Sequence, residues 1–308
     1  MKLTQKDFAS SFGVHESEIP AKSSALIGEL DFEITEIVGK ARDKLIIQVV
    51  DKIRQDEQVI ASLIRKDIWR KGWAENLQLY IDSKGAHSTL IPKFIRGGLP
   101  IRWFGKYFES HDNNFELNYI SVLREFLFES YFKNISSLYE FGAGTGFNLV
   151  HASQSLPGVK LIGTDFVPSA VELMNRVGSD FSIPLSSSIF DMMNPGDANL
   201  IMDPNSGVLT FGSLEQLGGN LVPMIDYLCQ QRPNICVHIE PAVELYNPKG
   251  LEDYLATWFQ TKRGYSAGLI TLLQDYQNQG LISIKKIQRL NFGSLMMEGY
   301  NLIVWEPF

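Results

Sequence analysis

The sequence has few cysteines, no long apolar run and no excess of basic residues. Its 308 residues include two cysteines, Cys229 and Cys236. Their spacing matches neither a redox CxxC pair nor a zinc site, and two thiols build no disulfide framework, so we expect both to be reduced. The sequence contains no apolar run of about 18 residues, and the N-terminal MKLTQKDFAS is polar. It therefore predicts no membrane span, no signal peptide and a cytoplasmic location.

The charge is acidic and unevenly distributed. The formal net charge is -7, yet the first 112 residues hold 17 Lys and Arg against 16 Asp and Glu. The acidity therefore lies in the rest of the chain. A nucleic-acid-binding protein needs a basic surface to neutralise phosphates. The sequence therefore predicts no nucleic-acid partner.

The length and composition favour a globular protein of two domains. Hydrophobic residues make up 44% and charged residues 20% of the chain, a balance typical of soluble globules. Apolar spacing predicts helices over 1–20 and 26–66, and aromatic and basic residues alternate over 69–108. We predict that residues 1–112 form a mainly helical and aromatic lid or dimerisation region, with a homodimer as one possibility. Residues 113–308 form the second predicted domain.

The second domain alternates strands and helices. After a helix over 115–132, we predict strands over 138–141, 160–164, 181–185, 207–211, 234–240, 281–290 and 300–307. Helices are expected over 147–155, from Pro168, over 219–230 and over 250–278. Alternation of this kind predicts a parallel sheet covered on both faces. The fold class is therefore α/β, a Rossmann-like sheet of seven mostly parallel strands whose last strand is antiparallel.

A glycine-rich loop follows the first of these strands. Residues 140–146 read EFGAGTG and lie where the strand turns into a helix. Glycines there allow a ligand to approach the backbone, and the helix N-terminus offers free N–H groups to an anion. A dinucleotide site needs a small residue five positions after the first glycine, and Phe147 stands there. NAD is therefore not expected.

An acidic residue before a G-x-G-x-G loop resembles motif I of the class I S-adenosylmethionine (SAM)-dependent methyltransferases. The resemblance covers about residues 115–308, and it implies that SAM is the cofactor. It implies that Asp165 accepts hydrogen bonds from the ribose hydroxyls, that Phe166 lines the adenine pocket and that Asp191 lies on the adenine side. The full set of expected cofactor-binding residues is Glu140, Gly142, Ala143, Gly144, Gly146, Asp165, Phe166, Phe190, Asp191, Phe211 and Arg102. Arg102 is the candidate for pairing with the SAM carboxylate, because RWFGKYF at 102–108 is expected to fold over the cofactor.

Methyl transfer from a sulfonium needs in-line positioning and, for many acceptors, a base. His238 and Glu240 end the fifth strand on one face, so they are the candidate catalytic residues. In many small-molecule methyltransferases a His lies near the acceptor where this sequence has Gln216. The candidate substrate-binding residues are Glu215, Gln216, Tyr246, Arg263 and Tyr265. No spacing indicates a metal site.

The sequence thus predicts SAM-dependent methylation of an oxygen or nitrogen in a small molecule, such as a sugar or a natural-product intermediate. Two alternatives remain open. One is a protein methyltransferase, since an acidic groove suits a basic peptide. The other is a non-catalytic SAM-binding interaction protein, which would tolerate loss of His238 and Glu240.

Overall fold

The computed structural model describes residues 1–59, 63–265 and 267–308. Part of the helix expected over 26–66 lies outside the described residues, at 60–62. Within the described ranges, no helix combines the length and apolar character that crossing a membrane requires.

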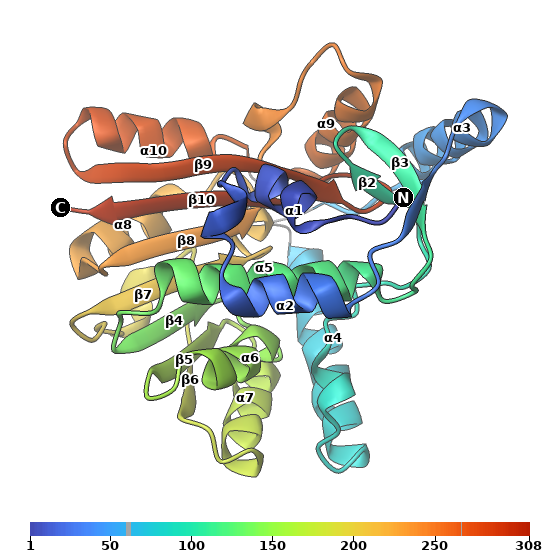
Figure 1. Cartoon of the computed structure of the whole chain (residues 1–308). Helices are drawn as coiled ribbons and strands as arrows, with labels where there is room; N and C mark the ends of the chain where they lie inside the picture. Colours follow the sequence, from blue (N-terminus) through green and yellow to red (C-terminus); the bar gives the residue numbers. More distant parts are fainter. Residues whose placement is uncertain (60–62, 266) are drawn as a thin grey trace.

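A single sheet runs through the molecule (Figure 1). In the described residues it has ten strands in the order β1-β3-β2-β9-β10-β8-β7-β4-β5-β6. Five strands are parallel to one another: β4 (Ser137–Phe141), β5 (Lys160–Asp165), β6 (Leu185–Ile189), β7 (Ser206–Phe211) and β8 (Ile235–Glu240). β10 (Tyr300–Pro307) inserts antiparallel between β8 and β9 (Ile282–Gly293). These seven strands confirm the predicted Rossmann-like sheet with its antiparallel last strand.

Three short strands from the N-terminal region extend the sheet beyond β9. They are β1 (Ile34–Glu36), β2 (Ile101–Trp103) and β3 (Lys106–Ser110). β2 pairs with β9, and β3 joins β2 to β1. The prediction of unbroken helix over 26–66 is therefore wrong at β1. The residues expected to fold over the cofactor, 102–108, instead lie in the β2–β3 hairpin, which the sheet holds between β9 and the edge strand β1.

Helices cover both faces of the sheet (Figure 1). One face packs against α1 (Gln5–Phe12), α2 (Ala21–Glu29), α5 (Phe115–Tyr131), α6 (Phe147–Ser155) and α7 (Pro168–Asp180). The other packs against α8 (Val222–Gln231) and α10 (Leu269–Asn278). Because side chains alternate along a strand, Leu138 joins the first core and Tyr139 the second.

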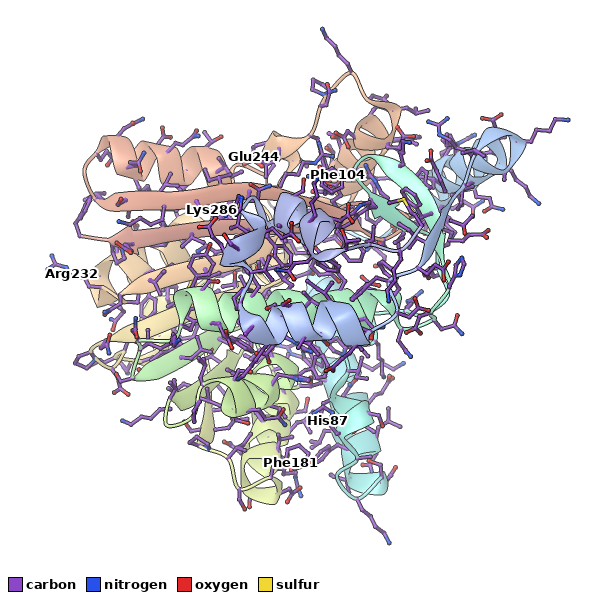
Figure 2. All side chains as sticks on the ribbon, in the orientation of Figure 1. His87, Phe104, Phe181, Arg232, Glu244 and Lys286 are labelled. Atoms are coloured by element: carbon purple, nitrogen blue, oxygen red, sulfur yellow. The ribbon has the colours of Figure 1, made fainter. Side chains whose placement is uncertain are left out.

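Three further helices lie toward the carboxyl ends of the parallel strands. α3 (Gly39–Gln55) packs on α9 (Leu251–Arg263), and α4 (Leu63–Asp82) packs on α7. Tyr80 of α4 donates a 2.9 Å hydrogen bond to Asp180 at the end of α7. Just beyond these helix ends, the rings of His87 and Phe181 stack with centroids 6.1 Å apart (Figure 2). Short 3-10 turns complete the described elements: η1 (Glu16–Glu18), η2 (His87–Leu90), η3 (Pro195–Ala198), η4 (Leu214–Leu217) and η5 (Val243–Leu245).

Two predicted boundaries are corrected by local backbone chemistry. The strand expected over 181–185 is β6, which begins at Leu185, because Pro184 before it has no N–H to donate. The helix expected over 250–278 is divided into α9 and α10. Gly264 ends α9 and Gly268 precedes α10, both in the left-handed conformation that glycine adopts most easily.

Candidate functional site

A cavity opens at the carboxyl ends of β4, β5, β6 and β7. It encloses about 1110 Å³ counted out to its mouth, ample for a ligand of nucleotide size. Ligands of open α/β sheets bind outside these strand ends. The lining combines the glycine loop, three acidic residues and aromatic residues from the N-terminal region: Lys66, Trp69, Trp73, Pro92, Phe94, Ile95, Ile120, Glu140, Gly142, Ala143, Gly144, Thr145, Phe147, Asn148, Asp165, Phe166, Phe190, Asp191, Met192, Met193, Phe211, Gly212, Ser213, Gln216 and Leu217.

The glycine loop is held against the end of β5. The backbone N–H of Gly144 donates a 3.1 Å hydrogen bond to Asp165 Oδ2. The hydroxyl of Thr145 donates a 2.6 Å bond to the carbonyl of Leu90. Gly144 has a φ of +56°, and a Cβ there would lie 2.7 Å from the ring of Trp73. Glycine is therefore required at this position both by the backbone and by the tryptophan that covers it.

Asp165 ends β5 and lines the cavity. Its Oδ1 accepts a 2.9 Å hydrogen bond from the N–H of Val167, and its Oδ2 accepts the bond from Gly144. Burial raises the pKa of the carboxyl to about 6. Because each carboxylate oxygen can accept more than one hydrogen bond, both retain acceptor capacity for hydroxyl groups of a ligand.

Glu140 lies near the end of β4, also in the cavity lining. The amide Nδ2 of Asn148 donates a 2.7 Å hydrogen bond to Glu140 Oε1. Oε2 is buried and has no partner among the described residues. Burial raises the pKa of this carboxyl to about 7, although the hydrogen bond from Asn148 and the charge of Arg124 lower it. A buried oxygen of this kind is a ready acceptor for a cationic ligand group.

The third acid, Asp191, follows β6 and lies beside Phe166 at the same edge of the sheet. Lys66 Nζ of α4 lies 3.4 Å from Asp191 Oδ2 and 5.9 Å from the centre of the Phe166 ring. The N–H of Met193 donates to Asp191 Oδ1 over 2.9 Å. Asp191, Phe166 and the neighbouring Phe190 all belong to the lining of the cavity.

α4 forms a wall of the cavity. The sequence placed this segment in a predicted lid or dimerisation region, but none of its residues was among the predicted site residues. Trp69 and Trp73 stack with ring centroids 5.5 Å apart, and Trp69 Nε1 donates a 3.2 Å hydrogen bond to Gln216 Oε1. Lys66 reaches the cavity from the same helix. The available signal was the spacing of Trp69 and Trp73, four residues apart and therefore on one helix face.

His238, the expected base, lies in the core and is not part of the cavity lining. Trp305 Nε1 donates a 2.8 Å hydrogen bond to His238 Nε2, and His238 Nδ1 lies 2.9 Å from the hydroxyl of Thr210. Nε2 is therefore an acceptor, and burial lowers the pKa of the ring to about 3. Both ring nitrogens already have hydrogen-bond partners, one on β7 and one on β10. His238 therefore connects neighbouring strands of the sheet.

Glu240 is also outside the cavity lining, and its carboxylate binds backbone N–H groups. Its Oε1 accepts 3.0 Å hydrogen bonds from the N–H groups of Ser213 and Leu214, and its Oε2 accepts a 3.2 Å bond from that of Glu215. The carboxylate therefore holds the turn after β7 in place. That turn includes Phe211 and Gln216 in the cavity lining.

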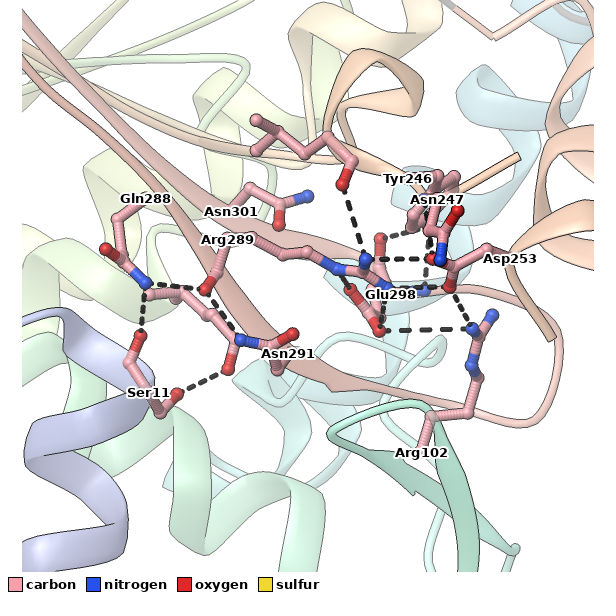
Figure 3. A network of polar contacts seen from close by, with 12 residues as sticks. Ser11, Arg102, Tyr246, Asn247, Asp253, Gln288, Arg289, Asn291, Glu298 and Asn301 are labelled. Atoms are coloured by element: carbon pink, nitrogen blue, oxygen red, sulfur yellow. Dashed lines mark hydrogen bonds and ion pairs between the residues drawn. The ribbon is translucent and has the colours of Figure 1, made fainter. Parts of the chain in front are cut away.

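Arg102 lies in a different polar cluster, shown in Figure 3. It is fully buried, donates a 3.0 Å hydrogen bond to Asp253 Oδ1 and lies 3.9 Å from Glu298 Oε1. Arg289 binds the same two carboxylates. The expected pairing of Arg102 with a cofactor carboxylate is thus replaced by an internal ion-pair network, because the 102–108 hairpin joins the sheet at β9.

The expected substrate-binding residues are divided. Gln216 lines the cavity, and its Nε2 donates a 2.7 Å hydrogen bond to Glu215 Oε1. Tyr246 belongs to the cluster of Figure 3, where its hydroxyl accepts from Glu298 N. Arg263 donates to Asp56 and to the Tyr265 hydroxyl, over 2.7 and 3.0 Å. In the described residues, no group of three or more acidic, histidine or cysteine side chains is placed to hold a metal ion.

No protein-family model matches this sequence, and no curated protein matches it either. Solved structures do resemble the fold. One is geranyl diphosphate C-methyltransferase from Streptomyces coelicolor A3(2), with a TM-score of 0.46, 11% identity, and coverage of 64% of this chain and 85% of that chain. Another is the pyocyanin biosynthetic protein PhzM, with a TM-score of 0.46, 12% identity, and coverage of 63% and 59%. A third is the [4+2]-cyclase SpnF, with a TM-score of 0.44, 11% identity, and coverage of 61% and 80%.

Proposed function

We propose that this protein is a SAM-dependent methyltransferase that acts on an oxygen or nitrogen atom of a small molecule. The observation that carries the proposal is the placement of three acids, Glu140, Asp165 and Asp191, around one glycine loop in a single cavity. The three acids lie near the end of β4, at the end of β5 and just after β6, and these three strands are neighbours in the parallel part of the sheet.

The chemistry of these residues fits the parts of SAM. Asp165 has acceptor capacity for ribose hydroxyls, and Phe166 with Phe190 offers aromatic surface beside Asp191 for adenine. The free Oε2 of Glu140 suits the ammonium of the amino-acid end. SAM supplies an electrophilic methyl group on a sulfonium sulfur.

The remaining lining favours an acceptor of largely apolar surface. Most of its side chains are aromatic or aliphatic, and its polar members are Lys66, Thr145, Asn148, Ser213 and Gln216; the apolar members include Trp69, Trp73, Pro92, Phe94, Ile95, Ile120, Phe147, Phe211 and Leu217. This surface suits a small organic acceptor better than a basic peptide, which would seek carboxylates. The acceptor atom would attack the methyl carbon as the bond from that carbon to sulfur breaks, which leaves S-adenosylhomocysteine, and the acceptor's proton would pass to solvent water. The chain's contribution is to position the acceptor, which lowers the barrier.

A non-catalytic SAM-binding protein is the second candidate. It is favoured by one observation, that His238 and Glu240 are both bound within the core. Screening acceptors for conversion of SAM to S-adenosylhomocysteine separates the two candidates, since only the methyltransferase produces it.

Calorimetric titration tests cofactor binding directly. SAM and S-adenosylhomocysteine should bind the wild type, NAD should not, and Asp165→Ala should abolish binding of both sulfur compounds. Asn175→Ala is the matched control, because Asn175 is an exposed residue of α7 outside the cavity lining. Binding of NAD, or the absence of any binding by the sulfur compounds, would overturn the proposal.

A further inference from the structure

A buried arginine lies behind the glycine loop, on α5. Arg124 is 1% exposed, and its guanidinium lies over the Phe147 ring at 4.4 Å from the centroid. Its Nη2 donates a 3.1 Å hydrogen bond to Ser121 Oγ, and its Nη1 donates a 3.4 Å bond to Asn148 Oδ1. A buried charge needs partners to offset its lost hydration. This one is held by an aromatic ring and two neutral oxygens.

Asn148 connects this arginine to the cavity. While its Oδ1 accepts from Arg124, its Nδ2 donates the 2.7 Å hydrogen bond to Glu140 Oε1. The amide dipole is thereby aligned with its negative end toward the cation and its positive end toward the carboxyl. Phe147 and Asn148 are the first two residues of α6, so both contacts are fixed by the helix start.

The interposed amide has a specific consequence for Glu140. An arginine in direct contact would pair with both carboxylate oxygens and leave neither for a ligand. With Asn148 between the two charges, Arg124 favours the ionised form of Glu140 while Oε2 stays without a partner. Asn148 therefore orients the carboxyl group through Oε1, Arg124 favours its ionised form, and Oε2 stays unpaired in a residue that lines the cavity.

We propose that Arg124 and Asn148 are positioning residues that hold Glu140 as an open carboxylate for the ammonium group of the cofactor's amino-acid end. The inference rests on the proposed function. It adds that the protein prefers a ligand that carries the amino acid over the nucleoside thioether alone. Residues of α5 and of the start of α6, behind the glycine loop, determine this selectivity.

Two commercially available ligands test this. S-adenosylhomocysteine carries the ammonium, whereas 5′-methylthioadenosine has the same nucleoside and thioether without the amino acid. Asn148→Ala should lower the affinity for S-adenosylhomocysteine about tenfold or more, because a hydrogen bond to a charged group is lost. The affinity for 5′-methylthioadenosine should be unchanged. Asn148→Asp keeps the shape but removes the donor and adds a like charge. It should give the larger loss with the same selectivity.

Arg124→Gln should shift S-adenosylhomocysteine affinity in the same direction, again with no effect on 5′-methylthioadenosine. In the background of Glu140→Gln, Asn148→Ala should cause little further loss, because both changes act through one carboxylate. Asn175→Ala is the matched control and should change neither affinity. Equal weakening of both ligands by Asn148→Asp, or no weakening of S-adenosylhomocysteine, would overturn the inference. Failure of both ligands to bind the wild type would instead overturn the proposed function and this inference with it.

Discussion

The Asp165 carboxyl has a pKa close to physiological pH, so cofactor binding should depend on pH. Burial raises this pKa to about 6. Ribose hydroxyls donate to the carboxylate but lose that acceptor when it is protonated, so affinity should fall as the pH drops through 6. Burial also raises the pKa of Glu140, to about 7, and its protonation weakens binding of an ammonium in the same direction. Calorimetric titration of S-adenosylhomocysteine between pH 5.5 and 8 measures the effect.

Glu140→Gln is the control for this prediction. It removes the titration step near pH 7 that is due to Glu140 while leaving the step near pH 6 that is due to Asp165. An affinity that is flat with pH in the wild type, or that rises as the pH falls, would show that neither carboxylate contacts the ligand.

His238 is expected to contribute to stability and not to proton transfer. His238→Ala should leave the Thr210 hydroxyl and the Trp305 indole without their buried partner. It should therefore lower the free energy of unfolding by about 2–4 kcal/mol, as urea denaturation would measure. Affinity for S-adenosylhomocysteine should be unchanged. A variant with wild-type stability and abolished methyl transfer would restore His238 as the base.

At the scale of elements, α4 is the part of the site that most needs a direct test. Gly144→Ala places a Cβ 2.7 Å from the Trp73 ring on a backbone with φ of +56°. The strained loop and displaced tryptophan should weaken S-adenosylhomocysteine binding. Adding Trp73→Ala removes the clash and should recover part of the affinity, which calorimetry on both variants would show. If Gly144→Ala and the wild type bound S-adenosylhomocysteine with equal affinity, α4 would not be part of the ligand site.

The helices and strands also show which features of the structure could be predicted from the sequence. The turn between β4 and α6 was predictable, because its glycines follow from local chain geometry. The choice of Asp165 came from the resemblance to the methyltransferase family and not from local geometry. The division at Gly264 and Gly268 was in principle readable from the same glycine chemistry. The roles of His238 and Arg102 were not, because their partners Trp305 and Asp253 lie 67 and 151 residues away in the chain. The alternation of side chains along a strand predicts which face of the sheet a residue lies on. It does not predict which distant side chains form hydrogen bonds with that residue's nitrogen atoms.

At the scale of the whole molecule, the N-terminal region and the Rossmann-like sheet share one core. Phe12 of α1 packs on Phe126 of α5 with ring centroids 4.6 Å apart, and β2 pairs with β9. A fragment of residues 113–308 would expose this apolar surface and lose the α4 wall. It should aggregate or unfold without a cooperative transition, as thermal denaturation followed by circular dichroism would show. Cooperative melting of the fragment would support the predicted independent domain.

A crystal structure of the protein with S-adenosylhomocysteine tests the central claim most directly. The account predicts the ribose hydroxyls within hydrogen-bond distance of the Asp165 carboxylate, the adenine beside Phe166, and the ammonium facing Glu140 Oε2. A ligand bound outside this cavity, or bound in it with its amino-acid end turned away from Glu140, would contradict the account.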